Sequence, residues 1–399
     1  MDEENDRFRR KVESMRNTNA QMMIRSASIM LALALVGPPL FGQTEVVAMG
    51  LLGPQKLILT PRGNFLVTET NTVPNLGRIS FVSRSGTRRS LVEGLPSGTE
   101  VVGGGSGPSA MILKDRTLYV SIGAGDIERR SATGASIHNP AGISSPLYIS
   151  ILEFRFSLDV DQVGGTFKMS PAQQQTLADG DEIEMEDGSG AKAIVRVLVR
   201  FPQSTPEGSG YRFSNPWGLA LSADGLTMWA IDASQNSLNK VDTTTGRWSR
   251  VMRFAPTPNP TPIGPPLIDA VPTGIRIYGQ QLLISFLSGF PFPRNAARVL
   301  AVNPDSRTVE PFIFGLTSAT DIFWRDRGAD LRPQFWALEF SLSQSAKPAG
   351  PGRLLRWDSS EPIVVASDLR APVSLAYDAS SEELFILELS GRILKVSAR

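Results

Sequence analysis

The chain of 399 residues contains no cysteine and a single histidine, His138. The first absence excludes disulfides, thiolate metal sites and a cysteine nucleophile, and the second argues against histidine-pair catalysis and multi-histidine metal centres. Neither sign of charge is in excess, since 40 lysines and arginines face 39 aspartates and glutamates. A balanced chain has no net field to attract nucleic acid or an anionic membrane surface, so we expect neither as a partner.

Reaction motifs are also missing. No nucleophile elbow, dinucleotide fingerprint or phosphate loop occurs in a suitable context. The glycine-rich stretch GGGSG (103–107) lacks the lysine and the following helix that a phosphate loop requires. The sequence therefore favours a non-catalytic protein, and we expect no cofactor.

Residues 15–43, MRNTNAQMMIRSASIMLALALVGPPLFGQ, have the layout of a secretory signal peptide. Two arginines precede an apolar core over about residues 28–36, which is shorter than the roughly 20 apolar residues of a membrane-spanning helix. Gly42 is a small residue suited to cleavage. Residues 1–14 hold five acids, unlike a normal signal n-region, so we expect translation to start at Met15. From the signal-peptide layout, we expect the mature chain to lie outside the cytoplasm, in the periplasm or the medium. An uncleaved membrane anchor is the alternative.

One pattern recurs along the chain with a period of roughly fifty residues. Each copy has a proline, two further residues, an apolar anchor in a short apolar strand, a turn and a second apolar strand. The five copies are GPQKLILTPRGNFLVTE (53–69), GPSAMILKDRTLYVSI (107–122), NPWGLALSADGLTMWAID (215–232), VPTGIRIYGQQLLISF (271–286) and APVSLAYDASSEELFILE (371–388). A sixth copy, ATDIFWRDRGADLRPQFWALE (319–339), lacks the proline. The six anchors are Leu57, Met111, Leu219, Ile275, Ile322 and Leu375.

Third and fourth strands follow several copies, as in GRISFVS (77–83) and TRRSLVEGLP (87–96). Four short antiparallel strands repeated radially make a β-propeller, so the sequence predicts an all-β, six-bladed propeller. The last copy stops after its third strand, and TEVVAM (44–49) precedes the first copy. We expect this N-terminal strand to complete the final blade and close the ring.

The interval between the second and third anchors is twice as long as the others and leaves room for a seventh blade. We favour an insertion in blade two, at about residues 157–192 of a single propeller domain that spans 43–399. A helix starts with Ser170 and Pro171, which suit an N-cap and a first helical position. The stretch 181–201 then predicts a hairpin around the turn GSG.

Several stretches resemble the ScyD/ScyE family of secreted propellers. They are GFPFPRNAARV (289–299), SNPWGL (214–219) with IDASQNSLNKVD (231–242), GLTSATDI (315–322), and GLPSG (94–98) with GSGPSAMILKDRTLYVSIGAG (105–125). The resemblance covers roughly residues 44–399 and implies the six-bladed fold and secretion. It brings no catalytic residue or ligand to carry over. The acidic extension before Met15 departs from it.

Long loops between strands two and three, and between blades, share one face of the predicted disc, and such loops commonly carry binding sites. One of them, LSGFPFPRNA (287–296), holds aromatic residues in a backbone restricted by prolines. Its candidate contacts are Phe290, Phe292, Arg294 and Arg298. The alternative is that both phenylalanines pack as lids on the neighbouring blade. The loop 123–146 adds Asp126, Arg130 and His138, and solvent exposure alone explains this histidine equally well.

Two further sets of positions recur from blade to blade. Residues before the anchors lie near the channel mouth, and the polar ones among them are Lys56 and Asp321. Acids end the second strand of four blades, namely Glu69, Asp232, Glu339 and Glu388. A ring of carboxylates suits a hard cation such as calcium. The simpler interpretation is that each acid accepts backbone amides of its own turn or pairs with an arginine that opens the third strand.

We therefore expect a monomeric, non-catalytic binding scaffold that recognises a small molecule, a glycan or an envelope protein at its loop-rich face. The alternative is a calcium-dependent hydrolase or lactonase-like enzyme that uses the channel carboxylates.

Overall fold

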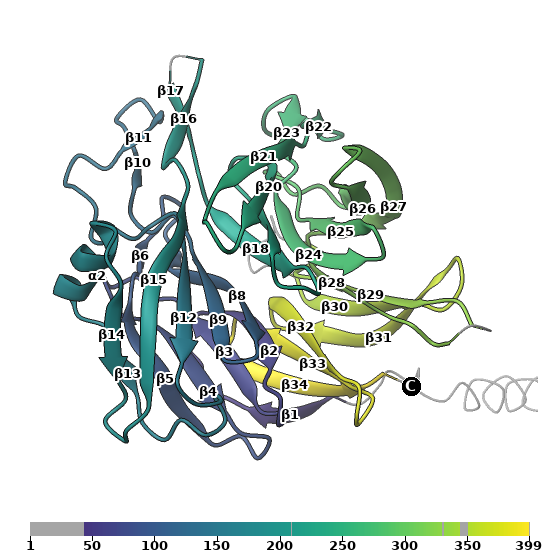
Figure 1. Cartoon of the computed structure of the whole chain (residues 1–399). Helices are drawn as coiled ribbons and strands as arrows, with labels where there is room; N and C mark the ends of the chain where they lie inside the picture. Colours follow the sequence, from purple (N-terminus) through teal and green to yellow (C-terminus); the bar gives the residue numbers. More distant parts are fainter. Residues whose placement is uncertain (1–43, 209, 329–330, 344–349, 399) are drawn as a thin grey trace, which may run out of the picture. The chain divides into compact units, whose positions relative to one another are not determined.

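The computed structural model describes residues 44–208, 210–328, 331–343 and 350–398. The expected signal segment, with Met15 and Gly42, lies outside the described residues. Over the described part, six antiparallel sheets stand as blades around a central channel (Figure 1). The predicted all-β, six-bladed propeller is confirmed.

The strands of each blade run from the channel outward in chain order, with one exception in blade two and one in blade six. Blades one to three contain β2 (Pro54–Leu59), β3 (Phe65–Glu69), β4 (Gly77–Val82) and β5 (Arg88–Leu95); β8 (Pro108–Lys114), β9 (Thr117–Ile122), β12 (Ser150–Phe156), β15 (Lys192–Arg200) and β14 (Ile183–Glu186); and β18 (Pro216–Leu221), β19 (Thr227–Asp232), β20 (Ser237–Asp242) and β21 (Trp248–Arg253). Blades four to six contain β24 (Pro272–Tyr278), β25 (Gln281–Phe286), β26 (Ala297–Asn303) and β27 (Thr308–Leu316); β28 (Ala319–Arg325), β29 (Gln334–Glu339), β30 (Gly352–Trp357) and β31 (Pro362–Leu369); and β32 (Pro372–Asp378), β33 (Glu383–Glu388), β34 (Arg392–Ser397) and β1 (Glu45–Ala48).

Blade faces pack against neighbouring blades, and this explains the apolar character of the second strands. In β3, all five residues of FLVTE are buried. A strand buried on both faces carries a continuous apolar run in place of alternation. The inner strands contact one another in the cyclic order β2, β8, β18, β24, β28, β32 and back to β2, so the ring is closed.

The N-terminal strand β1 completes blade six. It pairs antiparallel with β34, with Val46 opposite Leu394 and Glu45 opposite Lys395. The first and last strands of the described chain therefore share one sheet, as predicted. In Figure 1, purple β1 lies beside yellow β34.

Blade two carries the predicted insertion. Helix α2 (Pro171–Ala178) begins with Ser170 as N-cap, and Ser170 and Gln173 form a reciprocal capping box. The following hairpin consists of β14 and β15, and β15 supplies the fourth strand of the blade. A short strand, β13 (Phe167–Lys168), pairs in parallel with β5 and so ties the insertion to blade one. The long interval contains no seventh blade.

Each inner strand contains one extra residue near its start. In blade one, Pro54 lies opposite Glu69 and Lys56 lies opposite Thr68, which leaves Gln55 without a partner of its own. The same bulge recurs in all six blades. The extra residues are Gln55, Ser109, Trp217, Thr273, Thr320 and Val373. A bulge redirects the side chain of its extra residue.

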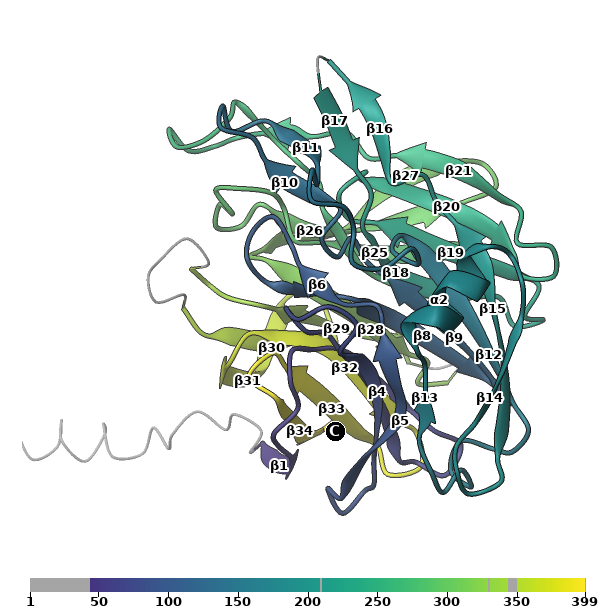
Figure 2. The ribbon, with the colours of Figure 1, turned by 90° about the vertical axis from the view of Figure 1, so that its left-hand side faces the viewer.

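Short hairpins rise from the loop-rich face. Their strands are β6 (Gly98–Thr99) with β7 (Gly105–Ser106), β10 (Glu128–Arg130) with β11 (Ser136–His138), β16 (Ser204–Glu207) with β17 (Gly210–Phe213), and β22 (Thr257–Pro258) with β23 (Leu267–Ile268). The hairpins β10–β11 and β16–β17 lie side by side (Figure 2). Among the described residues, we find no helix with the length and apolar content to cross a membrane.

Candidate functional site

A cavity of about 740 Å³ opens at the loop-rich end of the channel. Its floor is formed by the bulged residues Gln55, Trp217, Thr273, Thr320 and Val373. Loop residues that follow the second strands, among them Thr70, Leu287, Phe340 and Leu389, form much of the wall. A cavity of this size falls in the range of small-molecule sites. We call it the upper cavity.

The hydroxyls of the floor are held by hydrogen bonds between blades. Thr273 Oγ1 donates to the carbonyl oxygen of Ala319 at 2.9 Å, and Thr320 Oγ1 donates to that of Pro372 at 3.0 Å. Ser109, the bulged residue that does not line the cavity, makes the same kind of bond, with its Oγ donating to the carbonyl oxygen of Pro216 at 2.8 Å. Each acceptor belongs to the first residue of the next inner strand. These hydroxyls are therefore oriented before any ligand arrives, with their lone pairs left as acceptors.

Blade one supplies the one acidic residue among the described residues of the lining, Glu100. It follows β6 in the hairpin β6–β7, where its backbone N–H donates to the carbonyl oxygen of Gly104 at 2.9 Å. The Gly103 N–H donates back to the Glu100 carbonyl oxygen at 2.8 Å. This turn fixes the backbone from which the carboxyl projects.

Burial raises the pKa of Glu100 above its ordinary value. Hydrogen bonds from Ser106 and Asn215 oppose that rise, and the charge of Glu128 adds to it. The Glu100 Oε1 atom is buried and has no hydrogen-bond partner. A buried acceptor without a partner is costly, and a carboxyl with a shifted pKa in a cavity marks a candidate for proton transfer.

The rest of the upper cavity is mainly apolar. Its lining includes the aromatic ring of Trp217 in the floor, that of Phe340 in the wall, and the side chains of Leu51, Leu52 and Leu287. Oriented polar groups surrounded by apolar and aromatic walls are typical of small-molecule sites.

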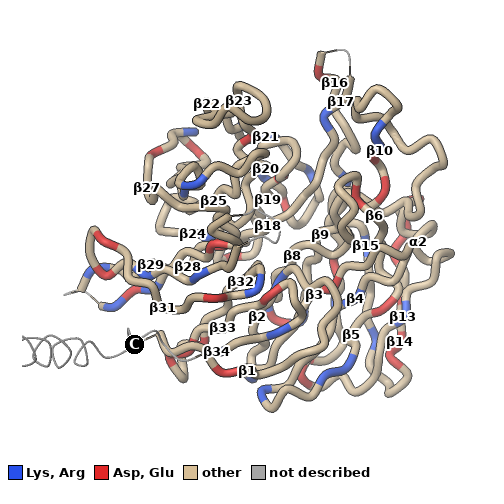
Figure 3. The backbone as a smooth tube through the Cα atoms, turned by 180° about the vertical axis from the view of Figure 1, so that it is seen from behind, with Lys and Arg blue, Asp and Glu red and all other residues tan. Residues whose placement is uncertain are grey.

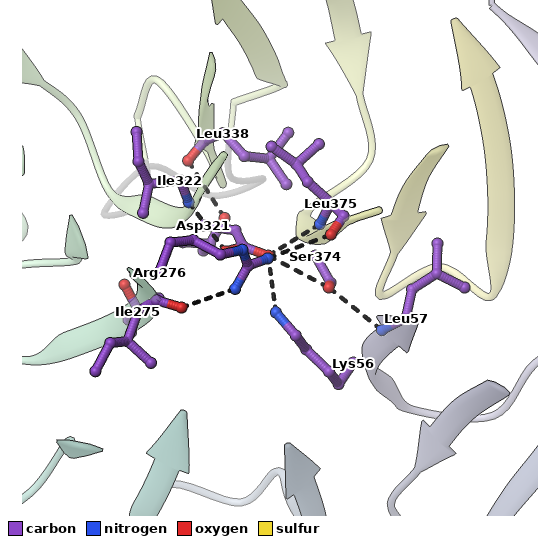
Figure 4. A network of polar contacts seen from close by, with 12 residues as sticks. Lys56, Leu57, Ile275, Arg276, Asp321, Ile322, Leu338, Ser374 and Leu375 are labelled. Carbon is purple, nitrogen blue, oxygen red and sulfur yellow. Dashed lines mark hydrogen bonds and ion pairs between the residues drawn. The ribbon is translucent and has the colours of Figure 1, made fainter. Parts of the chain in front are cut away.

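Below this floor, an ionic cluster crosses the channel (Figure 4). Asp321 Oδ2 accepts from Lys56 Nζ at 2.9 Å and from the Arg276 guanidinium at 2.9 Å. Burial alone would raise the pKa of Asp321, but the charges of Arg276 and Lys56 outweigh it and the pKa is lowered. Burial, and then the charge of Arg276, lowers the pKa of Lys56 to about 8 in spite of its bond to Asp321.

The structure thus brings together two residues that the sequence singled out, Lys56 and Asp321, and adds Arg276. Neither Lys56 nor Asp321 lines the upper cavity. The predicted mouth positions lie one residue too far along each inner strand, because the bulge places the preceding residue at the mouth.

The four acids at the ends of second strands are engaged within their own blades. Glu69 pairs with Arg78 at 2.8 Å, Glu339 with Arg353, and Glu388 with Arg392 at 2.6 Å. Asp232 accepts backbone N–H groups of Asn215, Ser234 and Gln235 at 2.8–3.1 Å. Across the described ranges, no group of three or more histidine, cysteine, aspartate or glutamate side chains is placed to hold a metal ion.

The aromatic loop contributes only its first residue, Leu287, to the lining of the upper cavity. Phe290 is 56% exposed and meets the half-buried Phe292 edge to face, with ring centroids 6.3 Å apart. Arg294 is exposed, and Arg298 lies over the ring of Phe286 at 5.3 Å. Burial lowers the pKa of Arg298. None of these four candidate residues is among those that line the upper cavity.

The candidates of the long loop make contacts that fix the loop. Asp126 is buried and accepts the Ser144 backbone N–H at 3.0 Å. Arg130 donates to Ser136 Oγ at 2.7 Å. His138 Nε2 lies 3.0 Å from Ser204 Oγ, and the imidazole packs edge to face on Tyr211 and Phe213. The contacts of His138 join the hairpins β10–β11 and β16–β17.

Sequence reasoning missed Glu100, Trp217 and Phe340. Trp217 directly follows the proline that marks five of the six copies, and that proline was the available signal for the bulge position. Glu100 and Phe340 carry no comparable signal, because they lie in loops whose fold decides which side chains face the channel.

Two comparisons, with protein-family models and with curated proteins, gave no match. Among solved structures, the PQQ-bound aldose sugar dehydrogenase of Streptomyces coelicolor is 15% identical and covers 90% of this chain and 99% of its own, with a TM-score of 0.46. The apo-form soluble aldose sugar dehydrogenase of Escherichia coli is 12% identical, with the same coverage and a TM-score of 0.49. A nidogen/laminin complex is 10% identical and covers 81% of this chain and 91% of its own, with a TM-score of 0.40.

These findings correct two expectations. The expected non-catalytic scaffold is not supported: the solved structures similar to this chain include sugar dehydrogenases, although a likeness at 12–15% identity shows the fold alone. We expected no cofactor, whereas one of those similar structures is a PQQ-bound form. Whether PQQ fits this chain depends on the residues that line the upper cavity.

The size of the upper cavity suits PQQ, whereas its charge does not. The volume and the aromatic side chains of Trp217 and Phe340 suit a planar ring system. PQQ is a tricarboxylate, however, and no described residue of the lining is a lysine, arginine or histidine, while Glu100 adds negative charge. The described residues also contain no acidic cluster for calcium. The residues present do not fit PQQ with calcium, and we derive no step through that group.

Proposed function

We propose that this chain is an enzyme that binds a small, uncharged, hydroxyl-rich molecule in the upper cavity and uses Glu100 for proton transfer. The observation that carries the proposal is the carboxyl of Glu100, which lines the cavity with a raised pKa and a buried oxygen that has no hydrogen-bond partner. A proton-transfer group works best when its pKa lies near the working pH, and burial moves a carboxyl in that direction.

The lining supports the choice of substrate class. Thr273 and Thr320 present oriented hydroxyl oxygens that accept hydrogen bonds, and Gln55 adds an amide. Trp217 and Phe340 offer flat apolar surfaces for the C–H faces of a sugar ring. With no described cation in the lining, an anionic substrate has no partner for its charge. A neutral sugar or sugar lactone meets all of these conditions.

The reaction that needs the fewest additional components is hydrolysis of a sugar lactone. The Glu100 carboxylate takes a proton from water, the water oxygen bonds to the carbonyl carbon, and the ring C–O bond then breaks. The proton held by Glu100 passes to the leaving ring oxygen, so the products are the hydroxy acid and the unchanged carboxylate. General base catalysis of this kind contributes about 10²–10⁴-fold to rate.

Aldose oxidation, the activity that the names of two similar structures describe, is the second candidate. A sugar hydroxyl beside Glu100 would lose its proton to the same carboxylate. Hydride removal also requires an acceptor, and the described lining does not match PQQ. The two reactions give different products and are separable by assay.

The test uses the chain from Thr44 onward with neutral sugar lactones, and in parallel with aldoses plus an electron acceptor dye, with and without PQQ and calcium. We expect lactone hydrolysis without additives and a loss of about 100-fold or more in Glu100→Gln. The rate should fall as pH drops through the raised pKa of Glu100, because only the carboxylate accepts a proton.

Glu128→Gln is the matched control. It removes a neighbouring charge that raises the pKa of Glu100 but leaves the Glu100 carboxyl in place. We expect this variant to keep its maximal rate and to shift the acidic limb of its pH profile to lower pH. Dye reduction that requires PQQ would select aldose oxidation, and full activity in Glu100→Gln with either substrate class would refute the proposal.

We also propose that the chain is a secreted member of the ScyD/ScyE family. The signal-peptide layout of residues 15–43 and the motifs GFPFPRNAARV and SNPWGL support this placement. N-terminal sequencing of protein recovered from the periplasm and from the medium tests it. A first residue near Gln43 in either fraction is the expected result, and recovery of the intact N-terminus from the cytoplasm alone would contradict it.

A further inference from the structure

A second cavity, of about 360 Å³, lies at the other end of the channel. We call it the lower cavity. Its walls are apolar side chains from the later halves of the inner strands, including Ile58, Ile112, Leu221, Phe323 and Tyr377. Two charged residues lie among its described lining residues, Lys56 and Arg276, and both also border the narrow gap beneath the upper cavity.

The ionic cluster between the cavities is unbalanced. Lys56 and Arg276 share one carboxylate oxygen of Asp321, which also accepts the Leu375 backbone N–H at 3.0 Å. Two cations facing one anion leave an excess of positive charge. The side chains of Lys56 and Arg276 are 16% and 22% exposed, whereas that of Asp321 is 1% exposed. The accessible part of the cluster is therefore cationic.

We infer that the lower cavity binds a small organic monocarboxylate with an apolar body. The carboxylate would lie against Lys56 and Arg276 and balance the excess charge, and the apolar body would extend along Ile58, Ile112 and Phe323. A neutral molecule of the same shape leaves the excess charge in place, and a cation is repelled by it. This inference rests on the lower cavity and does not involve Glu100.

Protonation of Lys56 gives a second readout. The charged groups that face it are Arg276 from β24 and Asp321 from β28, and its pKa is lowered to about 8. A carboxylate bound beside Lys56 favours the ammonium form and raises that pKa. Binding near pH 8 should therefore take up protons. Affinity should fall at higher pH, where Lys56 is neutral and Arg276 and Asp321 balance each other.

Isothermal titration calorimetry on the chain from Thr44 onward tests the inference with octanoate, octanol and octyltrimethylammonium, which share one tail. We expect octanoate to bind one to one and at least about tenfold more tightly than octanol, because only the carboxylate makes charge-assisted contacts with Lys56 and Arg276. The ammonium compound should not bind. Titrations at about pH 8 in buffers of different ionisation enthalpy measure the proton uptake. Equal affinities for octanoate and octanol, or no binding of octanoate, would overturn the inference.

Variants locate the site. Arg276→Met should lower octanoate affinity about tenfold or more. Because this variant leaves Asp321 with one cation fewer and is open to misfolding, Ile112→Glu provides an independent test on the cavity wall, where a carboxylate repels the ligand. Ile263→Glu is the matched control on the surface, where Ile263 is 62% exposed. Octanoate binding by a folded Ile112→Glu variant at the affinity of the control would place the ligand elsewhere and refute the inference.

Discussion

Buried carboxylates recur at the same place in the blades, and the pairing arginine comes from the next strand of the same sheet. Glu69, Glu339 and Glu388 are at most 1% exposed. Each would be an uncompensated buried charge without its arginine, so the repeated pair fixes the loop between the second and third strands. That loop carries residues of the upper cavity wall, such as Thr70, Phe340 and Leu389. These ion pairs therefore hold the wall of the upper cavity in place without lining the cavity themselves.

Removal of one such carboxylate should be costly. Glu388 accepts the Arg370 backbone N–H at 2.7 Å and the Ser390 hydroxyl at 2.9 Å, in addition to Arg392. We expect Glu388→Ala to lower the free energy of unfolding by about 3–5 kcal/mol, because it leaves Arg392 unpaired in a largely buried setting.

Urea unfolding of the two variants Glu388→Ala and Glu45→Ala measures the difference. Glu45 pairs with Lys395 at 2.8 Å, but its side chain is 68% exposed. An exposed pair contributes about 1 kcal/mol or less. Similar losses in the free energy of unfolding of both variants would show that burial does not set the contribution of these ion pairs.

Asp232 differs from the other three acids because it accepts backbone N–H groups without an arginine partner. Burial raises its pKa to about 6, and the hydrogen bonds from Gln235, Asn215 and Ser234 only partly oppose that rise. Between about pH 4 and pH 6, Asp232 is therefore protonated in the folded state and ionised in the unfolded state. Its contribution to stability falls as pH rises through this window.

The measurement compares wild type with Asp232→Asn by thermal or urea unfolding across that window. The shift corresponds to about 3 kcal/mol, at roughly 1.4 kcal/mol per pKa unit. We expect the stability of the wild type relative to the variant to decline between about pH 4 and pH 6 by that order. A constant difference between the two proteins over this range would show that Asp232 keeps an ordinary pKa.

Among the elements, β1 has a role out of proportion to its four residues. It is the only part of blade six that comes from the N-terminal side of the described chain, and its pairing with β34 closes the ring. Val47 and Ala48 also pack with Phe385 and Leu387 of that blade. Without β1, β34 becomes an exposed edge and part of this packing is lost.

Two truncated proteins test the closure. A chain that starts at Thr44 retains β1, and a chain that starts at Gly50 lacks it. We expect the shorter chain to have a Tm lower by about 5 °C or more, and to aggregate more readily through the free edge of β34. Equal Tm values would mean that the ring does not depend on its closing strand.

The elements also show where sequence reasoning succeeded. Strand pairs, closure by residues 44–49, the helix beginning at Pro171 and the hairpin of β14 and β15 were predicted, because apolar runs, turn residues and caps are local signals. The bulge at Gln55 was not, since one added residue changes no composition and a shift of one residue turns a strand side chain to the other face. Lys56 was therefore expected at the mouth, where Gln55 lies.

On the scale of the whole molecule, charge is distributed without a dominant sign. Figure 3 shows lysine and arginine interspersed with aspartate and glutamate over the blades. The local imbalance at Lys56, Arg276 and Asp321 could not be predicted from the sequence, because these residues come from blades one, four and five and meet only after the ring closes. Glu100 could not be predicted for a related reason, since its burial depends on how the hairpin β6–β7 packs at the channel mouth.

The bulge in every inner strand gives the molecule six equivalent backbone positions, five of which line the upper cavity, and the backbone geometry that holds them does not depend on which side chain is present. Gln55, Ser109, Trp217, Thr273, Thr320 and Val373 already span amide, hydroxyl, aromatic and aliphatic chemistry. Ligand preference in such a scaffold can diverge by exchange of these six side chains, while the apolar anchors two residues further along each inner strand stay unchanged. A library randomised at these positions alone would sample new specificities on a constant frame.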